Sequence, residues 1–214
     1  MERERIDLIE KLANRYATKK FDSTKKLTEE QLNNILTAMN LSASSYGLQP
    51  YKFIVVENPN VREKLKAASW GQSQITDASH LIIIARLNNL NEGHVDEFVD
   101  NITTTRGVER KQLAQYESMM KNTVNSLSED AAAVWTAKQA YIAMGNLLSY
   151  CASADIDACP MEGFSVDQYN EILGLKEKNL SAVLVAPVGY RASDDVYQHA
   201  KKVRKPLSQM VVRM

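Results

Sequence analysis

The sequence is poor in the residues that build metal centres and disulfide scaffolds. Its 214 residues include two cysteines, Cys151 and Cys159, and three histidines, His80, His94 and His199. Two cysteines without CxxC spacing exclude a disulfide scaffold and fit a reducing compartment. The histidines are too scattered to predict a zinc constellation. We therefore expect no metal site, and a cytoplasmic protein.

The chain also lacks an excess of one charge and any long apolar run. Its 26 Lys and Arg residues balance 26 Asp and Glu residues, so a general electrostatic attraction to nucleic acid is missing. No run approaches the roughly 20 apolar residues of a membrane span, and the charged start has no secretory signal. The eight glycines form neither a GxGxxG fingerprint nor a P-loop. We expect neither nucleic acid nor membrane as a partner, and no Rossmann fold.

What the sequence has is a 44% hydrophobic content, enough for one core, and patterns that mix helices with short strands. Apolar runs predict strands at 53–56, 80–85 and 182–189, the second of them central. Residues 157–160 read as a short edge strand or a loop. Periodicity and capping residues predict helices at 4–15, 28–39, 59–68, 128–154 and 165–173, and two helices within 93–126 broken near Gly107. This indicates one α+β domain over residues 1–214, with a basic arm over 191–214.

Four cations near the two ends of the chain form two spaced pairs. Arg15 and Lys19 have the i, i+4 spacing of one helix face, and Lys202 and Arg204 have the i, i+2 spacing of one side of an extended segment. Like charges held together repel unless an anion lies between them, which indicates a phosphate or carboxylate site. Alternatively, Arg15 only interacts with a helix dipole and Lys202 belongs to a solvated basic run.

Three further segments carry weaker signals. Residues 42–45 offer hydroxyl groups and close backbone approach to a ligand, although an ordinary capped loop has the same composition. The turn at 160–164 exposes backbone N–H groups, as most turns do. Gln72 and Gln74, near Trp70 and Gly71, offer amide groups to a heterocycle, although such glutamines are more often solvated.

Taken in order along the chain, these segments resemble the nitroreductase family of FMN-dependent NAD(P)H oxidoreductases. The matching blocks are RYATKKFD at 15–22, SASSYGLQPYKF at 42–53, TDASH at 76–80, PMEGF at 160–164 and KVRKP at 202–206. The similarity spans nearly the whole chain and is closest to the oxygen-insensitive nitroreductase and dihydropteridine reductase branch. It implies a three-layer α+β fold, with a central, mostly antiparallel sheet flanked by helices.

The resemblance also implies a homodimer that exchanges its C-terminal arms and builds each of two FMN sites from both chains. Arg15, Lys202 and Arg204 match the positions that hold the FMN phosphate, and Lys19 matches one that contacts the pyrimidine side of the flavin. The other implied cofactor-binding positions are Ala17 near the phosphate, Ala43, Ser44, Ser45 and Gly47 around the ring and ribityl chain, Gly71 and Gln74 at the pyrimidine edge, and Pro160, Met161, Glu162 and Gly163 behind the ring.

Three departures from the family pattern affect this site. Ala17 replaces a serine near the phosphate, and Ala43 replaces a proline, which leaves its loop less constrained in φ. Gly71 and Gln74 stand where well-studied members carry asparagine and lysine. Without that lysine, one positive charge fewer lies beside the reduced ring, so we expect a lower flavin reduction potential than in relatives that have it.

The function implied is a ping-pong transfer of hydride from NAD(P)H through flavin N5 to nitroaromatics, quinones or related electron-poor acceptors. No protein residue is then catalytic in the strict sense, and the sequence has no nucleophile-base or paired-carboxylate pattern. Residues 93–126 are expected to cover the pocket and set the acceptor. Two alternatives remain: another flavin-dependent reduction on the same fold, of a pteridine, an azo compound or a free flavin, and a non-catalytic nucleotide-binding protein.

Overall fold

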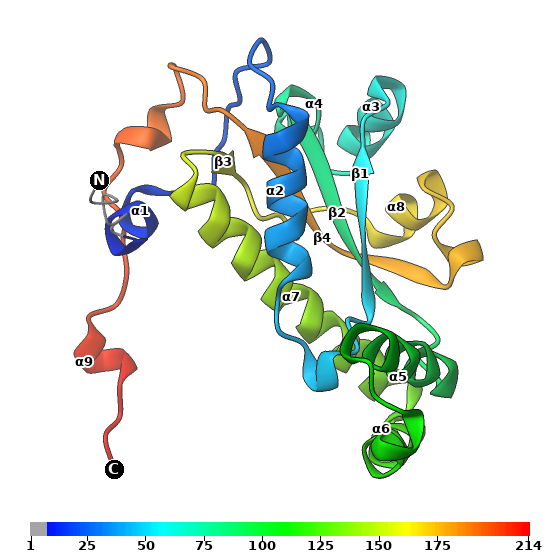
Figure 1. The fold of residues 1–214 in the computed structure, drawn as a ribbon. Coiled ribbons are helices and arrows are strands. Elements are labelled where there is room, and N and C mark those ends of the chain that lie inside the picture. The colour runs from blue at the N-terminus through cyan, green and yellow to red at the C-terminus, as the bar shows by residue number, and fades with distance from the viewer. Residues whose placement is uncertain (1–7) are drawn as a thin grey trace.

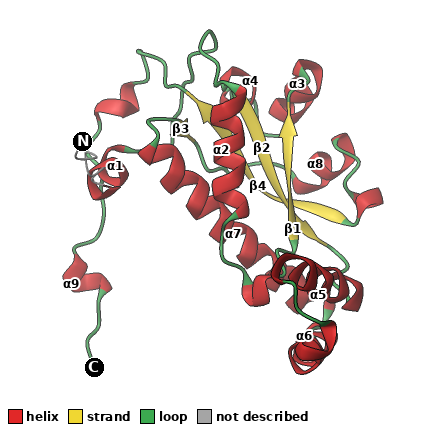
Figure 2. Cartoon of the chain, in the orientation of Figure 1, coloured by secondary structure: helices red, strands yellow, loops and turns green. Residues whose placement is uncertain are grey.

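A four-stranded antiparallel sheet lies at the centre of the molecule, whose computed structural model describes residues 8–214 (Figures 1 and 2). The strands are β1 (Tyr51–Val56), β2 (His80–Leu87), β3 (Asp157–Ala158) and β4 (Leu180–Gly189), in the order β1-β2-β4-β3. The predicted strands are confirmed with slightly longer bounds, and β2 is central as expected. Residues 157–158 form the short edge strand.

Alternating residues of β2 face two hydrophobic clusters, one on each side of the sheet. Ile82 and Ile84 pack with α2 (Glu29–Asn40) and α7 (Glu129–Ser153). Leu81 and Ile83 pack with residues of α3 (Pro59–Ala67) and α8 (Val166–Ile172). Figure 1 shows these two helix pairs on opposite faces of the sheet, so the predicted α+β fold with a flanked antiparallel sheet is confirmed.

The helix ends follow the capping signals of the sequence. Thr28 forms the expected capping box with Gln31, and Ser128 accepts a hydrogen bond from the N–H of Ala131. Gly107 ends α5 (Glu92–Arg106) with a φ of +65°, and α6 (Ala114–Ser126) follows, which confirms the break expected there.

Two short α-helices and one partly described α-helix complete the α-helices of residues 8–214. The helix predicted at 4–15 is seen as α1 (Leu8–Asn14), and its first predicted residues lie outside the described part. Sequence analysis missed α4 (Gln74–Asp77) and α9 (Leu207–Met210), because four residues are too few for a periodic pattern. No helix of residues 8–214 combines the length and the apolarity needed to cross a membrane.

The helices α5 and α6 form a small unit next to the end of the sheet, with a cluster of their own (Figure 1). Val95, Val99, Met120 and Val124 are buried there against Leu48 of the loop that precedes β1. Arg110 of the connection pairs with Asp96, Asp100 and Glu117, which ties the two helices together. Residues 93–126 therefore lie against the loop that carries Ser44, Ser45 and Gly47.

The two ends of the chain come together beside the sheet. The N–H of Asp22 donates to the Tyr190 carbonyl at 2.8 Å, and the N–H of Ala192 donates to the Lys20 carbonyl at 3.0 Å. After this pairing the arm runs on through α9 with its apolar side chains outward. Val203 is 84% exposed and Leu207 is 77% exposed.

Candidate functional site

Asp195 is the residue that fixes the N-terminal segment against the C-terminal arm. Its side chain accepts hydrogen bonds from the Tyr16 hydroxyl at 2.8 Å and from the backbone N–H groups of Lys19 and Lys20 at 2.9 and 3.1 Å. The N–H of Tyr197 donates to its other oxygen at 3.1 Å. Burial raises the pKa of the Asp195 carboxyl, but these four donors outweigh it and leave the pKa below its usual value.

This pairing creates a cavity of about 470 Å³ between the two ends of the chain. It is lined by six of the residues that the sequence predicted to bind a cofactor, namely Arg15, Ala17, Lys19, Pro160, Lys202 and Arg204. Gln198 and Tyr197 of the arm also line it. The two cation pairs, separated in sequence by most of the chain, therefore share one cavity.

Three of these cations lie close enough to disfavour one another's charge. Burial and the Arg204 guanidinium lower the pKa of Arg15, and burial, Arg15 and Arg204 lower the pKa of Lys202. Within the described part of the chain, no carboxylate lies within 4.0 Å of Arg15, Lys202 or Arg204. Positive charges held together without a counter-ion favour the binding of an anion, because an anion removes their mutual repulsion.

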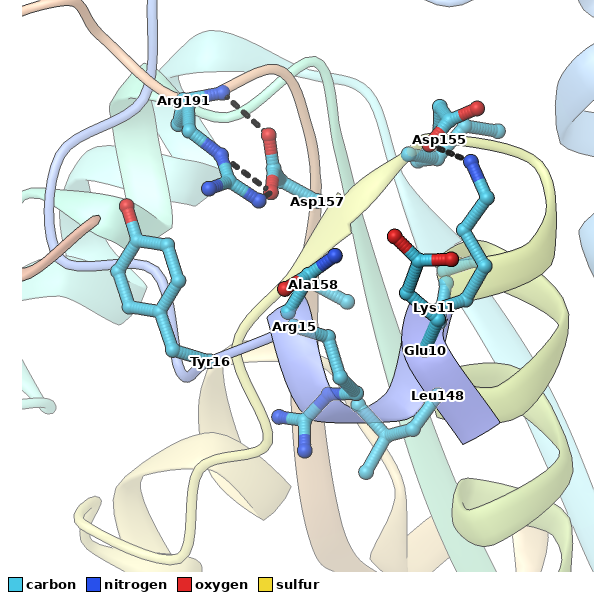
Figure 3. Close-up of a pocket in the computed structure, with 13 residues that line it drawn as sticks. Glu10, Lys11, Arg15, Tyr16, Leu148, Asp155, Asp157, Ala158 and Arg191 are labelled. Carbon is cyan, nitrogen blue, oxygen red and sulfur yellow. Dashed lines mark hydrogen bonds and ion pairs between the residues drawn. The ribbon is translucent and has the colours of Figure 1, made fainter. Parts of the chain in front are cut away.

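A second cavity of about 530 Å³ lies on the other side of Arg15, against α7 and β3 (Figure 3). Two of its three cations, Lys11 and Arg191, have carboxylate partners. Arg191 donates to Asp157 through both its guanidinium and its backbone N–H, and Lys11 pairs with Asp155. Because the charges of Lys11 and Arg191 are neutralised internally, the first cavity is the better anion site: Arg15, Lys202 and Arg204 meet there with no carboxylate partner among residues 8–214.

The segment 160–163 begins at the wall of the first cavity. Met161 exchanges two backbone hydrogen bonds with Val185 of β4, at 2.8 and 3.0 Å, so the sheet holds the segment in place. The N–H groups of Glu162 and Gly163 donate to none of the described residues. Two backbone donors on a rigid support are thus free to contact a ligand.

A turn at 70–74 packs against this segment. Trp70 and Gly71 have φ angles of +53° and +76°, and the Trp70 side chain is 73% exposed. The Gln72 amide donates to the Gly163 carbonyl at 2.9 Å, which fixes the turn to the segment. Gln74 is buried, yet its side-chain amide hydrogen-bonds to none of the described residues. The turn that holds Gly71 and Gln74 is therefore attached to the segment 160–163 through Trp70 and Gln72, and the cofactor contacts of Gly71 and Gln74 stay a prediction.

The remaining predicted residues, Ala43, Ser44, Ser45 and Gly47, lie elsewhere. The Ser45 N–H donates to Gln139 of α7 at 2.8 Å, and Gly47 lies against Phe98 of α5. Arg15 instead shares its second cavity with Ala152, near the C-terminal end of α7. From Gln139 to Ala152 an α-helix advances about 20 Å, so within one chain this loop does not join the cation cavity.

The two cysteines offer no reactive thiolate. Burial raises the pKa of Cys151 to about 12 and also raises the pKa of Cys159. Both side chains are free and buried. They stay protonated near neutral pH and act as packing residues.

Sequence reasoning missed Asp195 and Arg62, which position the site from outside it. Arg62 is buried and donates to the carbonyls of Ile75, Ala78 and Ser79, which secures the segment after Gln74. It also missed the 2.7 Å hydrogen bond from the Tyr141 hydroxyl to Glu162. No motif marks these residues, because each acts through a contact between segments distant in sequence.

Comparison with known proteins identifies the family of this chain. The model of the Nitroreductase family matches residues 12–190. A Haemophilus influenzae protein named "Putative NAD(P)H nitroreductase" is 36% identical over 217 residues, with 97% of this chain and 96% of that protein covered. A Bacillus subtilis protein of the same description, YfkO, is 36% identical over 191 residues, with 84% and 86% covered.

Solved structures show the same fold. The nitroreductase-type structure ydfN of Bacillus subtilis superposes with a TM-score of 0.87 at 20% identity, covering 97% of this chain and 99% of that one. A structure from Exiguobacterium sibiricum, described as a nitroreductase "in complex with FMN", has a TM-score of 0.83 at 17% identity and covers both chains completely. With the family match spanning most of its length and full-length relatives above 30% identity, the chain belongs to the nitroreductase family of oxidoreductases.

Proposed function

We propose that the protein binds FMN and passes reducing equivalents from NAD(P)H to nitroaromatics, quinones or related electron-poor acceptors by a ping-pong mechanism. The observation that carries this proposal is the convergence of Arg15, Lys202 and Arg204 without a carboxylate partner among the described residues. The names of the curated relatives and the FMN complex of a structural neighbour support it.

The residues present fit FMN in charge and in donor type. The three cations offer the phosphate charge-assisted hydrogen bonds. Lys19, the free N–H groups of Glu162 and Gly163, and the unpaired amide of Gln74 offer the ring cationic and neutral donors. Bound FMN supplies the redox chemistry, taking hydride at N5 and returning it to an acceptor, and donors near the ring stabilise the negative charge of its reduced form.

The separation of the loop 43–47 from the cation cavity supports a homodimer. The loop 43–47 and the cation cavity lie apart within one chain, so a site that uses both takes the loop from one chain and the cavity from the other. The exposed apolar side chains of Val203, Leu207, Met210 and Val212 favour exchange of the arm onto a second chain. In this proposal residues 1–214 form one domain with a C-terminal arm, and the dimer acts in the cytoplasm.

The visible spectrum of the purified protein tests the proposal. We expect a flavin absorption band that survives gel filtration and bleaches when NADH or NADPH is added without oxygen. Readdition of a quinone or a nitroaromatic restores the band, and parallel lines in double-reciprocal plots identify the ping-pong order. A colourless protein that takes up no added FMN contradicts the proposal and leaves a non-catalytic nucleotide-binding role.

The choice of acceptor separates the remaining alternatives. A pteridine, an azo compound and free FMN are assayed beside the quinone and the nitroaromatic with the same reduced enzyme. The highest kcat/KM identifies the class of substrate. The unit formed by α5 and α6 lies against the loop 43–47. Its exposed residues, such as Met119, are therefore the first to substitute in a search for residues that select one acceptor over another.

A further inference from the structure

Glu29, Glu57 and His80 meet at a corner of the molecule that the proposed FMN site does not use. One ligand atom of each, a carboxylate oxygen or an imidazole nitrogen, lies within 4.8 Å of the others. Glu29 and Glu57 are exposed, and His80 is partly buried. The three residues are far apart in the sequence, which is why the scattered histidines gave no sign of a metal site.

The fold brings these residues together through strand register and a helix start. Val56 pairs with Leu81 across β1 and β2, so Glu57 continues the register opposite His80, the first residue of β2. The segment before α2 is fixed to the same corner, because the N–H of Leu27 donates to the Ser79 hydroxyl at 2.7 Å. Glu29 therefore begins α2 beside the imidazole and the Glu57 carboxylate.

The imidazole is held in place by its neighbour. The Ser79 hydroxyl lies 3.0 Å from His80 Nδ1, which leaves Nε2 as the nitrogen available to a ligand. A hydrogen bond to the ring nitrogen that does not bind the metal orients metal-binding histidines in this way.

The two carboxylates lie close together without a balancing cation. No Lys or Arg of the described residues is within 4.0 Å of either carboxylate. Two negative groups at this separation repel each other, and a divalent cation relieves that repulsion. Imidazole nitrogen with carboxylate oxygen suits zinc and similar transition metals, whereas magnesium and calcium prefer oxygen alone.

We propose that Glu29, Glu57 and His80 bind a divalent transition-metal ion, with Zn²⁺ as the representative. Zinc bonds of about 2.0–2.2 Å place tetrahedral ligand atoms roughly 3.4 Å apart. The three ligand atoms lie within 4.8 Å of one another, and the exposed glutamate side chains can rotate to bring them closer. Three protein ligands leave the fourth position to solvent. The ion connects the start of α2 to the adjacent ends of β1 and β2, and this inference does not depend on the proposed function.

Calorimetric titration of the purified full-length protein with ZnCl₂, after dialysis against a chelator, tests the site. We expect one zinc ion per chain, and binding weakened about tenfold or more in Glu57→Gln and in His80→Asn. At one zinc concentration, the Tm of the wild type rises more than that of either variant, because the stabilisation by a bound ion grows with its affinity. The Glu57→Gln change is isosteric and exposed, so it leaves the fold intact.

Matched controls decide whether the named residues are the ligands. Glu30→Gln changes the next carboxylate of α2, and His94→Asn removes a partly buried histidine in the first turn of α5. Both variants are expected to bind zinc as the wild type does. Wild-type affinity in His80→Asn and Glu57→Gln contradicts the site. So does a Tm response to MgCl₂ equal to that with ZnCl₂, because it removes the role of the imidazole.

Discussion

The side-chain ammonium of Lys202 donates a hydrogen bond to the backbone carbonyl of Arg15, a residue 187 positions earlier in the chain. This contact joins the C-terminal arm to the end of α1 and places the Lys202 charge beside the Arg15 guanidinium. A hydrogen bond that brings two cations together raises the electrostatic energy of the free protein. The repulsion is removed when an anion binds, so binding and the order of the arm are expected to be coupled.

Removal of one cation tests the phosphate site. Arg204→Ala is expected to weaken FMN binding about 10- to 100-fold, the range for one charge-assisted hydrogen bond. Titration of apoprotein by flavin fluorescence measures the effect. Lys205→Ala removes a neighbouring exposed cation that does not line the cavity, so it leaves the affinity near that of the wild type. Equal losses in both variants contradict a specific phosphate contact.

The charge at the flavin edge is expected to set the reduction potential. Gln74→Lys adds a cation beside the reduced ring and raises the potential by tens of millivolts, since about 1.4 kcal/mol corresponds to about 30 mV for two electrons. Lys19→Ala is expected to lower the flavin reduction potential and the catalytic rate, and to have a smaller effect on FMN retention. Potentiometric titration of both variants checks the signs. Lys20→Ala, whose ammonium pairs with Asp194 instead, is the control.

The close packing of Gly163 leaves no room for a side chain. A Cβ at this position would lie 2.9 Å from Cζ3 of Trp70 and 3.3 Å from Nε2 of Gln72. Gly163→Ala is therefore expected to shift the tryptophan ring, change its fluorescence and weaken FMN binding. Adding Trp70→Ala removes the clash and restores part of the affinity. A double variant that binds no better than Gly163→Ala alone would show that the clash is not the cause.

Asp195 is expected to make the protein sensitive to acid. Its pKa is lower in the folded protein than in the unfolded chain, so its contribution to stability is present above about pH 4 and is lost as the pH falls through the folded value. Asp195→Asn costs about 2 kcal/mol at neutral pH, because its donors lose a charged acceptor. Urea unfolding between pH 3 and 7 measures both effects. Asp194 is an exposed neighbour, so Asp194→Asn is expected to leave the loss of stability at low pH largely unchanged.

The Arg110 network is expected to control the opening of α5 and α6. Hydrogen bonds from Arg110 and Lys121 lower the pKa of Glu117 to about 2. The stability that this pairing contributes is therefore fully present at pH values above the pKa of Glu117 in the unfolded chain, and it is lost as the pH falls toward 2. Arg110→Ala speeds amide hydrogen exchange in α6 and makes it less dependent on salt. Arg106→Ala, which removes an exposed charge outside the network, serves as the comparison. Unchanged exchange in Arg110→Ala contradicts this role.

Much of the fold could be predicted because its signals are local. The capping box of Thr28, the cap at Ser128 and the left-handed Gly107 each act within a few residues, and alternation along β2 follows from the pleat. The family blocks likewise identify Arg15, Lys202 and Arg204 without coordinates. The predicted strand boundaries were less accurate, because Tyr51 and Leu87 extend their strands only through pairing with Arg86 and Leu180 of neighbouring strands.

The sequence by itself determined the family and most of the elements, and it predicted which residues carry charge and donors to the candidate site. Only the tertiary structure decided how those residues are held. It alone reveals that Asp195 ties the chain ends together, that the loop 43–47 lies apart from the cations, and that His80 meets two glutamates. The physical reason is that hydrogen-bond partners and neighbouring charges are set by strand register and helix packing between distant segments, which no local pattern encodes.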